Sequence, residues 1–176
     1  DWVNNGISIQ PNATVAVIAA GAALILLSYG FRPAAAALGT LVPFIGGCAL
    51  FQILTGLNLG TDTLFMFGRT FGQAGVLAPG RMGPPGAMSW TLIGTALMLA
   101  SLPRYNRGRI LVPVLAVITT SLSGLSLIGY LYGASPLSTV PTLTIIALQT
   151  ATFILAVSIA LIMNVDEYPP MRLFAE

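Results

Sequence analysis

Long apolar runs, separated by short stretches rich in Pro, Gly, Asn and Arg, dominate the pattern along the chain. A helix needs about 20 mainly apolar residues to cross the hydrocarbon core of a bilayer. Five runs are long enough, and the prolines near their beginnings are typical of a first helical turn. The pattern predicts an all-α fold: a single polytopic integral membrane helix bundle over residues 1–176. Its five spans are expected at about 12–30, 34–56, 85–102, 110–132 and 141–163.

The segment between the second and third runs, residues 57–84, has a different pattern. It carries Asp62, Arg69 and Arg81 among several Leu, Met and Phe residues. This composition is too polar to cross a bilayer and too aromatic for a free linker. Because aromatic rings favour the membrane–water interface, we expect an ordered loop that lies at that interface.

One part of the pattern occurs twice. The stretch "PGRMGPPGAMSWTLIGTALMLAS" and the looser "SIQPNATVAVIAAGAALILLS" align Pro84 with Pro11, Gly94 with Gly21 and Ser101 with Ser28, all 73 residues apart. A third, weaker copy begins at Pro141. We interpret the copies as repeated helical hairpins, which predicts a sixth helix upstream of Asp1 in the parent chain. The alternative is that apolar helices beginning with Pro resemble each other by composition alone.

Composition supports a membrane setting. The chain has 56% hydrophobic residues, 7% charged residues and a mean hydropathy of +0.89. A soluble domain carries about 25% charged residues, because its surface faces water. The net charge of +2 is small and scattered, which argues against nucleic acid as a partner. The main partner expected is therefore the lipid bilayer.

The basic residues predict an orientation. All seven are Arg, and five of them fall on one side of the predicted bundle: Arg32, Arg104, Arg107, Arg109 and Arg172. The positive-inside rule places that side in the cytoplasm. We therefore expect a bacterial inner-membrane protein with a cytoplasmic C-terminus and a periplasmic 57–84 loop. The first four of these arginines are expected to act as cytoplasmic-side anchors.

Candidate catalytic chemistry is sparse. The chain has no His and one Cys, and Cys48 lies in an apolar run, where it is expected to be a small buried hydrophobe. The sequence predicts no catalytic residue, no metal site and no cofactor, and hence a chain that is not an enzyme. Coupled transporters usually place ionisable residues within their spans, and here every charge falls at or beyond a span end, so transport is the weaker interpretation.

Five polar residues remain as candidate ligand or partner contacts. Gln52 and Gln149 are the strongest polar groups within the predicted spans; they suit either a lipophilic ligand or an interhelical hydrogen bond. Asp62 and Arg69 suit a mutual ion pair. Arg81 suits a lipid phosphate or a ligand carboxylate. For these three loop residues, anchoring at the interface is the alternative.

Several phrases resemble a known family. "LTGLNLGTDTLFMF" followed by "PGRMGPPGAMSWTLIGTALMLA", together with the later "IGYLYGASPL" and "MNVDEYPPMRLFAE", is similar to the N-terminal multi-pass membrane region of PAS- or GAF-containing bacterial histidine kinases and diguanylate cyclases. Asn58 and Gly86 depart from that family's usual acid and Thr. The resemblance implies signal input across a membrane and a fused cytoplasmic signalling domain, and it carries over no ligand residue.

Two functions from different classes follow. The first is a non-catalytic sensory input module that relays an envelope or lipophilic signal to a cytoplasmic domain. The second is an accessory structural transmembrane subunit that packs against other membrane protein chains, as in a respiratory or photosynthetic assembly. The first predicts a polypeptide that continues beyond Glu176 into a signalling domain, whereas the second predicts apolar helix faces buried against other chains.

Overall fold

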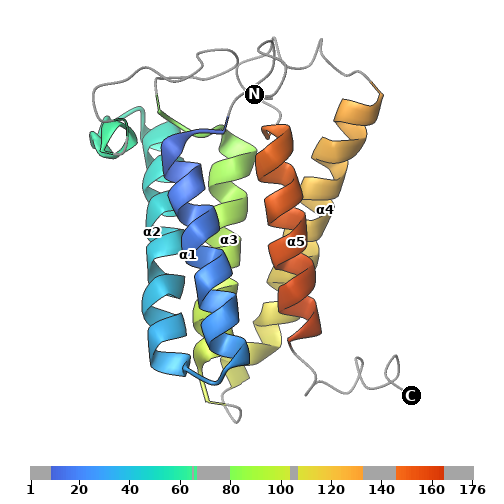
Figure 1. Cartoon of the computed structure of the whole chain (residues 1–176). Helices are drawn as coiled ribbons and strands as arrows, with labels where there is room; N and C mark the ends of the chain where they lie inside the picture. Colours follow the sequence, from blue (N-terminus) through green and yellow to red (C-terminus); the bar gives the residue numbers. More distant parts are fainter. Residues whose placement is uncertain (1–8, 65, 67–79, 104–106, 133–145, 165–176) are drawn as a thin grey trace.

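The computed structural model describes residues 9–64, 66, 80–103, 107–132 and 146–164. These residues confirm the all-α fold class and contain five α-helices and two short 3-10 helices. The elements are α1 (Pro11–Ser28), α2 (Arg32–Thr55), η1 (Thr61–Thr63), α3 (Pro84–Ser101), η2 (Arg107–Ile110), α4 (Leu111–Leu131) and α5 (Leu148–Met163). The α-helices run alternately up and down in one bundle (Figure 1). We call the end that contains η1 the Asp62 end and the opposite end the Arg32 end.

Prolines and glycines set several helix boundaries. A proline occupies the first or second position of α1, α2 and α3, where its missing N–H breaks no helical hydrogen bond. Gly56 ends α2 in the left-handed conformation with φ 72°, and its N–H donates to the carbonyl of Gln52. Gly30 has φ 81° in the short turn between α1 and α2. Since glycine alone adopts such angles at little cost, these two positions make the sharp reversals possible.

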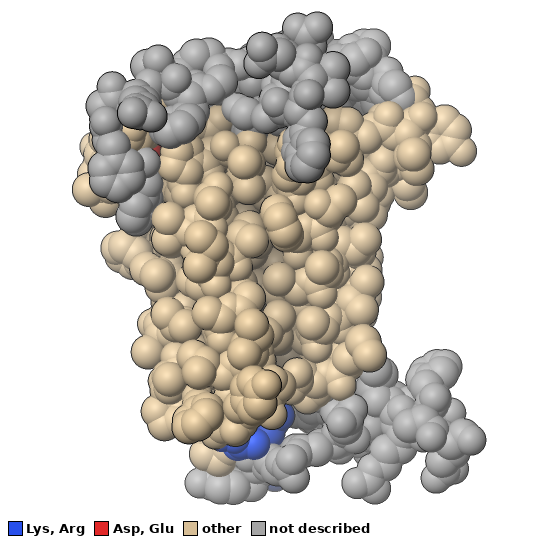
Figure 2. All heavy atoms as spheres, viewed as in Figure 1, with Lys and Arg blue, Asp and Glu red and all other residues tan. Residues whose placement is uncertain are grey.

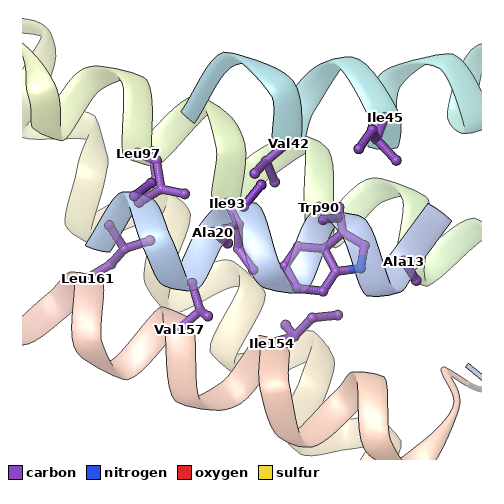
Figure 3. Packing of buried hydrophobic residues seen from close by; sticks show 14 of the residues in the cluster. Ala13, Ala20, Val42, Ile45, Trp90, Ile93, Leu97, Ile154, Val157 and Leu161 are labelled. Atoms are coloured by element: carbon purple, nitrogen blue, oxygen red, sulfur yellow. The ribbon is translucent and has the colours of Figure 1, made fainter. Parts of the chain in front are cut away.

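Helix α3 lies at the centre of the bundle. Ten of its eighteen residues are buried, against four of the twenty-one in α4. Trp90 is fully buried and packs, with Ile93 and Leu97, into one core cluster with residues of α1, α2 and α5 (Figure 3). On the α1 side the cluster is built from alanines at three- and four-residue spacing, which let that helix approach the indole ring.

Helices α2 and α3 pack more closely than side chains on both helices would allow. A Cβ built on Gly94 of α3 would collide with the ring of Pro43 in α2. On α2, a Cβ on Gly46 would lie 2.7 Å from the backbone nitrogen of Thr91. The two glycines, one on each helix, therefore fix the spacing of this pair.

A polar contact joins α4 to α5. The hydroxyls of Thr119 and Ser158 lie 2.7 Å apart, and both side chains are fully buried. The Thr119 hydroxyl also approaches the carbonyls of Leu115 and Ala116 in its own helix. The contact satisfies two buried hydroxyls at once.

We expect Thr119→Val to destabilise the chain by about 1 kcal/mol, the usual value of a hydrogen bond between helices in apolar surroundings. The substitution keeps the shape of the side chain and leaves the Ser158 hydroxyl without its partner on α4. The free energy of unfolding in mild detergent measures the loss. Ser121→Ala is the matched control, because Ser121 is exposed on the same helix and donates to the carbonyl of Val117 in that helix. Equal effects of the two substitutions would contradict the assignment.

The outer faces of the helices are strongly apolar. Three stretches are long and apolar enough to cross a membrane: Pro11–Ser28, Arg32–Thr55 and Arg107–Leu131. Large side chains such as Leu54 (77% exposed) and Leu131 (83% exposed) point outward, which fits a membrane protein. Each of the five predicted spans overlaps one α-helix, although α5 has 16 residues and α3 is not among the three spanning candidates. Residues 141–145 of the fifth predicted span lie outside the described residues.

The two aligned sequence stretches form α-helices of the same length. Helices α1 and α3 both have 18 residues, begin at the aligned prolines and end at the aligned serines. Their aligned glycines differ, because Gly94 packs against Pro43 while no atom outside α1 lies within 4 Å of a Cβ built on Gly21. The duplication itself stays a prediction.

Candidate functional site

A cluster of polar side chains lies at the Asp62 end, where the chain leaves α2 and later enters α3. We call it the Asp62 network, and its members are Gln52 in the last turn of α2, Thr61 and Asp62 in η1, and Arg81 three residues before α3. The network thus joins segments that are 29 residues apart in sequence. Its position follows from the bundle, because the end of α2 and the beginning of α3 meet at this end.

An ion pair forms the centre of the network. Arg81 Nε donates to Asp62 Oδ2 at 2.7 Å, and the side chains are 13% and 5% exposed, respectively. A charge-assisted bond of this length is strong. Since both groups are largely removed from water, removal of one partner would leave a poorly hydrated charge on the other.

Gln52 connects the ion pair to the backbone of the following segment. Its Nε2 donates to Asp62 Oδ1 and to Thr61 Oγ1, each at 3.0 Å. Its Oε1 accepts from the N–H of Leu59 at 2.8 Å and from Arg81 Nη2 at 3.3 Å. The amide is fully buried, and both its nitrogen and its oxygen form hydrogen bonds. This is the usual condition for a stable buried polar group.

Gly80 allows the ion pair to form. It has φ 78°, and a Cβ at this position would collide with the carbonyl of Asp62 and lie 2.7 Å from the sulfur of Met66. Only glycine combines this angle with so close a backbone approach. Met66 is buried, and its sulfur lies beside Gly80, so an apolar side chain packs next to the network.

Of the other candidate residues, only Gln149 is described, and it lies apart from this network. Gln149 lies in the first turn of α5, and its Oε1 is buried without a hydrogen-bond partner in the described part of the chain. Arg69 lies outside the described residues, and Asp62 pairs with Arg81. Cys48 is half-buried. Gln52 has a function that neither interpretation of the sequence included, because it organises the segment after its own helix.

Of the four expected anchors, three lie in the described residues, at the opposite end of the bundle. Arg32 Nη1 donates to the carbonyl of Leu102, just after α3, at 3.0 Å. Arg107 is exposed and Arg109 is buried, both in η2. Arg104 lies outside the described residues.

The sequence pointed to Asp62, Arg81 and Gln52 separately, but it did not indicate that they meet. It also missed Thr61 and Gly80. The available signal was the Pro-Gly dipeptide directly before Arg81, in the phrase "PGRM", since Pro-Gly marks a turn.

The geometry favours a contact between segments over proton transfer. Both carboxylate oxygens of Asp62 accept hydrogen bonds from the chain itself, so this group is poorly placed to take a proton from a substrate. In the residues that the structure describes, no group of three or more Asp, Glu, Cys or His side chains could hold a metal ion.

Comparisons with family models, with curated proteins and with solved structures found no match to this chain.

Proposed function

We propose that the chain is a non-catalytic sensory input module, which relays a change at the Asp62 end to a domain attached at the other side of a membrane. The observation that carries the proposal is that the α2–α3 pair is tied at both ends. The Asp62 network ties one end, and the bond from Arg32 to the Leu102 carbonyl ties the other.

The packing between these ties suits transmission. Gly46 and Gly94 let the two helices touch along their length, and closely packed interiors resist compression. A displacement of η1 acts on the end of α2 through Gln52 and on the beginning of α3 through Arg81. If the pair moves as a unit, as we propose, the displacement reaches the Arg32 end, where η2 contacts α3 and leads into α4.

The charge pattern gives the module a direction. Three of the four described arginines lie at the Arg32 end, and the side richer in Arg faces the cytoplasm. We therefore assign the Asp62 end to the periplasm and the Arg32 end to the cytoplasm of a bacterial inner membrane. The signal would act on the network from outside, and the output would leave from inside.

The test is the intact mass of the native polypeptide, measured in parallel in mild and in harsh detergent. A sensor predicts a chain that is much heavier than 18.3 kDa and keeps its signalling domain in both detergents, because the connection is covalent. A mass close to 18.3 kDa, with other membrane chains that are bound in mild detergent and lost in harsh detergent, would overturn the proposal and establish the accessory subunit.

A further inference from the structure

Two neighbouring polar groups of α3 are fully buried and have no hydrogen-bond partner in the described part of the chain. They are the hydroxyl of Ser89 and the indole N–H of Trp90, and both side chains are 0% exposed. Buried polar groups are almost always hydrogen-bonded, because an unpaired group loses its bonds to water and gains nothing in return. The two groups therefore favour the binding of a molecule that can bond to both.

Ser89 differs in this respect from the other hydroxyl residues of its own helix. Thr91, Thr95 and Ser101 each donate to the carbonyl four residues before them in α3, at 2.8 Å. The same arrangement would direct Ser89 to the carbonyl of Pro85, but its hydroxyl makes no such bond. The hydroxyl is therefore available to a partner outside the backbone of α3.

Gly86 provides room one turn before these two groups. It is buried, yet no atom of another described segment lies within 4 Å of a Cβ built on it. The other buried glycines of α2 and α3 are Gly39, Gly46 and Gly94, and each has a neighbouring atom within 3.3 Å of that position. Close packing explains those three glycines, whereas at Gly86 it leaves space.

Helical spacing places this space next to both polar groups. Ser89 and Trp90 follow Gly86 by three and four residues, so the three residues lie on one face of α3. Side chains of a helix lean toward its N-terminus, which brings the hydroxyl and the indole toward the level of Gly86. In Figure 3 the indole nitrogen lies on the side of the ring that faces Ala13, near the beginning of α1. This is the Asp62 end, where α3 also begins.

The surroundings restrict what can bind there. The molecule must be small, because neither Ser89 nor Trp90 is accessible from outside. A neutral molecule fits best, since on the face drawn in Figure 2 the wall between the ends of the bundle is free of charged atoms. The indole N–H can only donate a hydrogen bond, whereas the hydroxyl can donate or accept. Water meets all three conditions, and buried waters occur where polar groups line a space, while apolar cavities stay dry.

We propose that Gly86, Ser89 and Trp90 form a binding site for one buried water molecule at the Asp62 end of α3. The water accepts the indole N–H of Trp90 and bonds to the hydroxyl of Ser89, so that both groups gain a partner. The absence of a side chain at Gly86 provides the volume. The site does not depend on the sensory function, since a subunit of a membrane complex would hold the same water.

The experiment is an NMR measurement of cross-relaxation between water and the indole proton of Trp90, on the full chain in detergent micelles with 15N-labelled tryptophan. The signal of Trp2, the other tryptophan of the chain, is identified with a Trp2→Phe variant. We expect a cross-peak from the Trp90 indole proton to water, with the sign of a long-lived bound water. Cross-peaks to detergent alone, or none at all, would overturn the proposal.

Gly86→Ala separates a bound water from the Ser89 hydroxyl, whose exchanging proton could give a similar signal. The added methyl group meets no neighbour but takes the volume of the water, so the cross-peak is expected to disappear although Ser89 is intact. Gly21→Ala is the matched control and is expected to leave the cross-peak unchanged, because Gly21 lies in α1 and its Cβ position is also open. A cross-peak that persisted in Gly86→Ala would overturn the proposal.

Ser89→Ala is expected to weaken the binding of the water about fivefold, the factor that corresponds to one hydrogen bond, and so to reduce the cross-peak. Ser101→Ala is its matched control, because that hydroxyl is also buried in α3 but is bonded to the carbonyl of Leu97. Equal reductions in these two variants would also contradict the site.

Discussion

Gly94→Ala is expected to destabilise the bundle by about 3 kcal/mol, at the upper end of the usual range for overpacking a core. The added methyl group would collide with the ring of Pro43. A proline ring has no rotamer that could move aside, so the two helices must separate. That movement would also loosen the contacts of Gly46 with Thr91. The free energy of unfolding of the purified chain in mild detergent measures the effect.

The aligned glycine in α1 provides the control for Gly94→Ala. Gly21 aligns with Gly94 in the repeated stretch and lies in a helix of the same length, but no atom outside that helix lies within 4 Å of a Cβ built there. Gly21→Ala is expected to stabilise the chain by up to about 1 kcal/mol, because alanine is the better helix former. If the two substitutions had the same effect, the close packing of α2 and α3 would not be a source of stability.

Asp62→Asn is expected to cost about 3 kcal/mol of folding free energy, because the charge of Arg81 would stay largely buried without its counterion. We place the value at the lower end of the range for buried pairs, since Arg81 keeps 13% of its surface exposed. The introduced asparagine would still accept the hydrogen bond from Gln52 through its side-chain oxygen, so the loss reports on the ion pair. The same unfolding measurement in detergent gives the magnitude.

A double-mutant cycle isolates the pair. Arg81→Gln alone leaves the Asp62 carboxylate without its cation, and the double variant removes both charges. We expect the double variant to be more stable than the sum of the single effects predicts, with a coupling energy of about 2 kcal/mol. Additive effects would mean that the 2.7 Å contact between Asp62 and Arg81 contributes little to the free energy of unfolding. The hydrogen bonds of Gln52 would then hold the network together.

The helical fold could be predicted from sequence because its signals are local. Each apolar run is long, and the prolines that begin α1, α2 and α3 lie next to the residues they affect. Helices α1, α2 and α3 each begin with a proline in the first or second position. For α5 the prediction began at Pro141, whereas the described helix begins at Leu148.

The site was less predictable because it depends on contacts between distant residues. Asp62 has two arginines nearby in sequence, Arg69 and Arg81, and the sequence does not show which of them it contacts. In the described residues Asp62 pairs with Arg81, since the turn at Gly80 brings Arg81 against η1; Arg69 lies outside those residues. In the same way, composition alone could not show which of two aligned glycines, Gly21 or Gly94, would meet a neighbouring helix.

The central position of α3 has a consequence for how the chain is made. α3 has the same length as α1 but is not among the helices apolar enough to cross a membrane by themselves, and its polar or small residues Ser89, Gly94 and Ser101 are buried inside the bundle. A segment that leaves the translocation channel enters lipid in proportion to its own hydrophobicity. For a membrane-inserted chain, α3 would therefore leave the channel for the lipid only after α1 and α2 have inserted. Its insertion would depend on contacts with these two earlier helices.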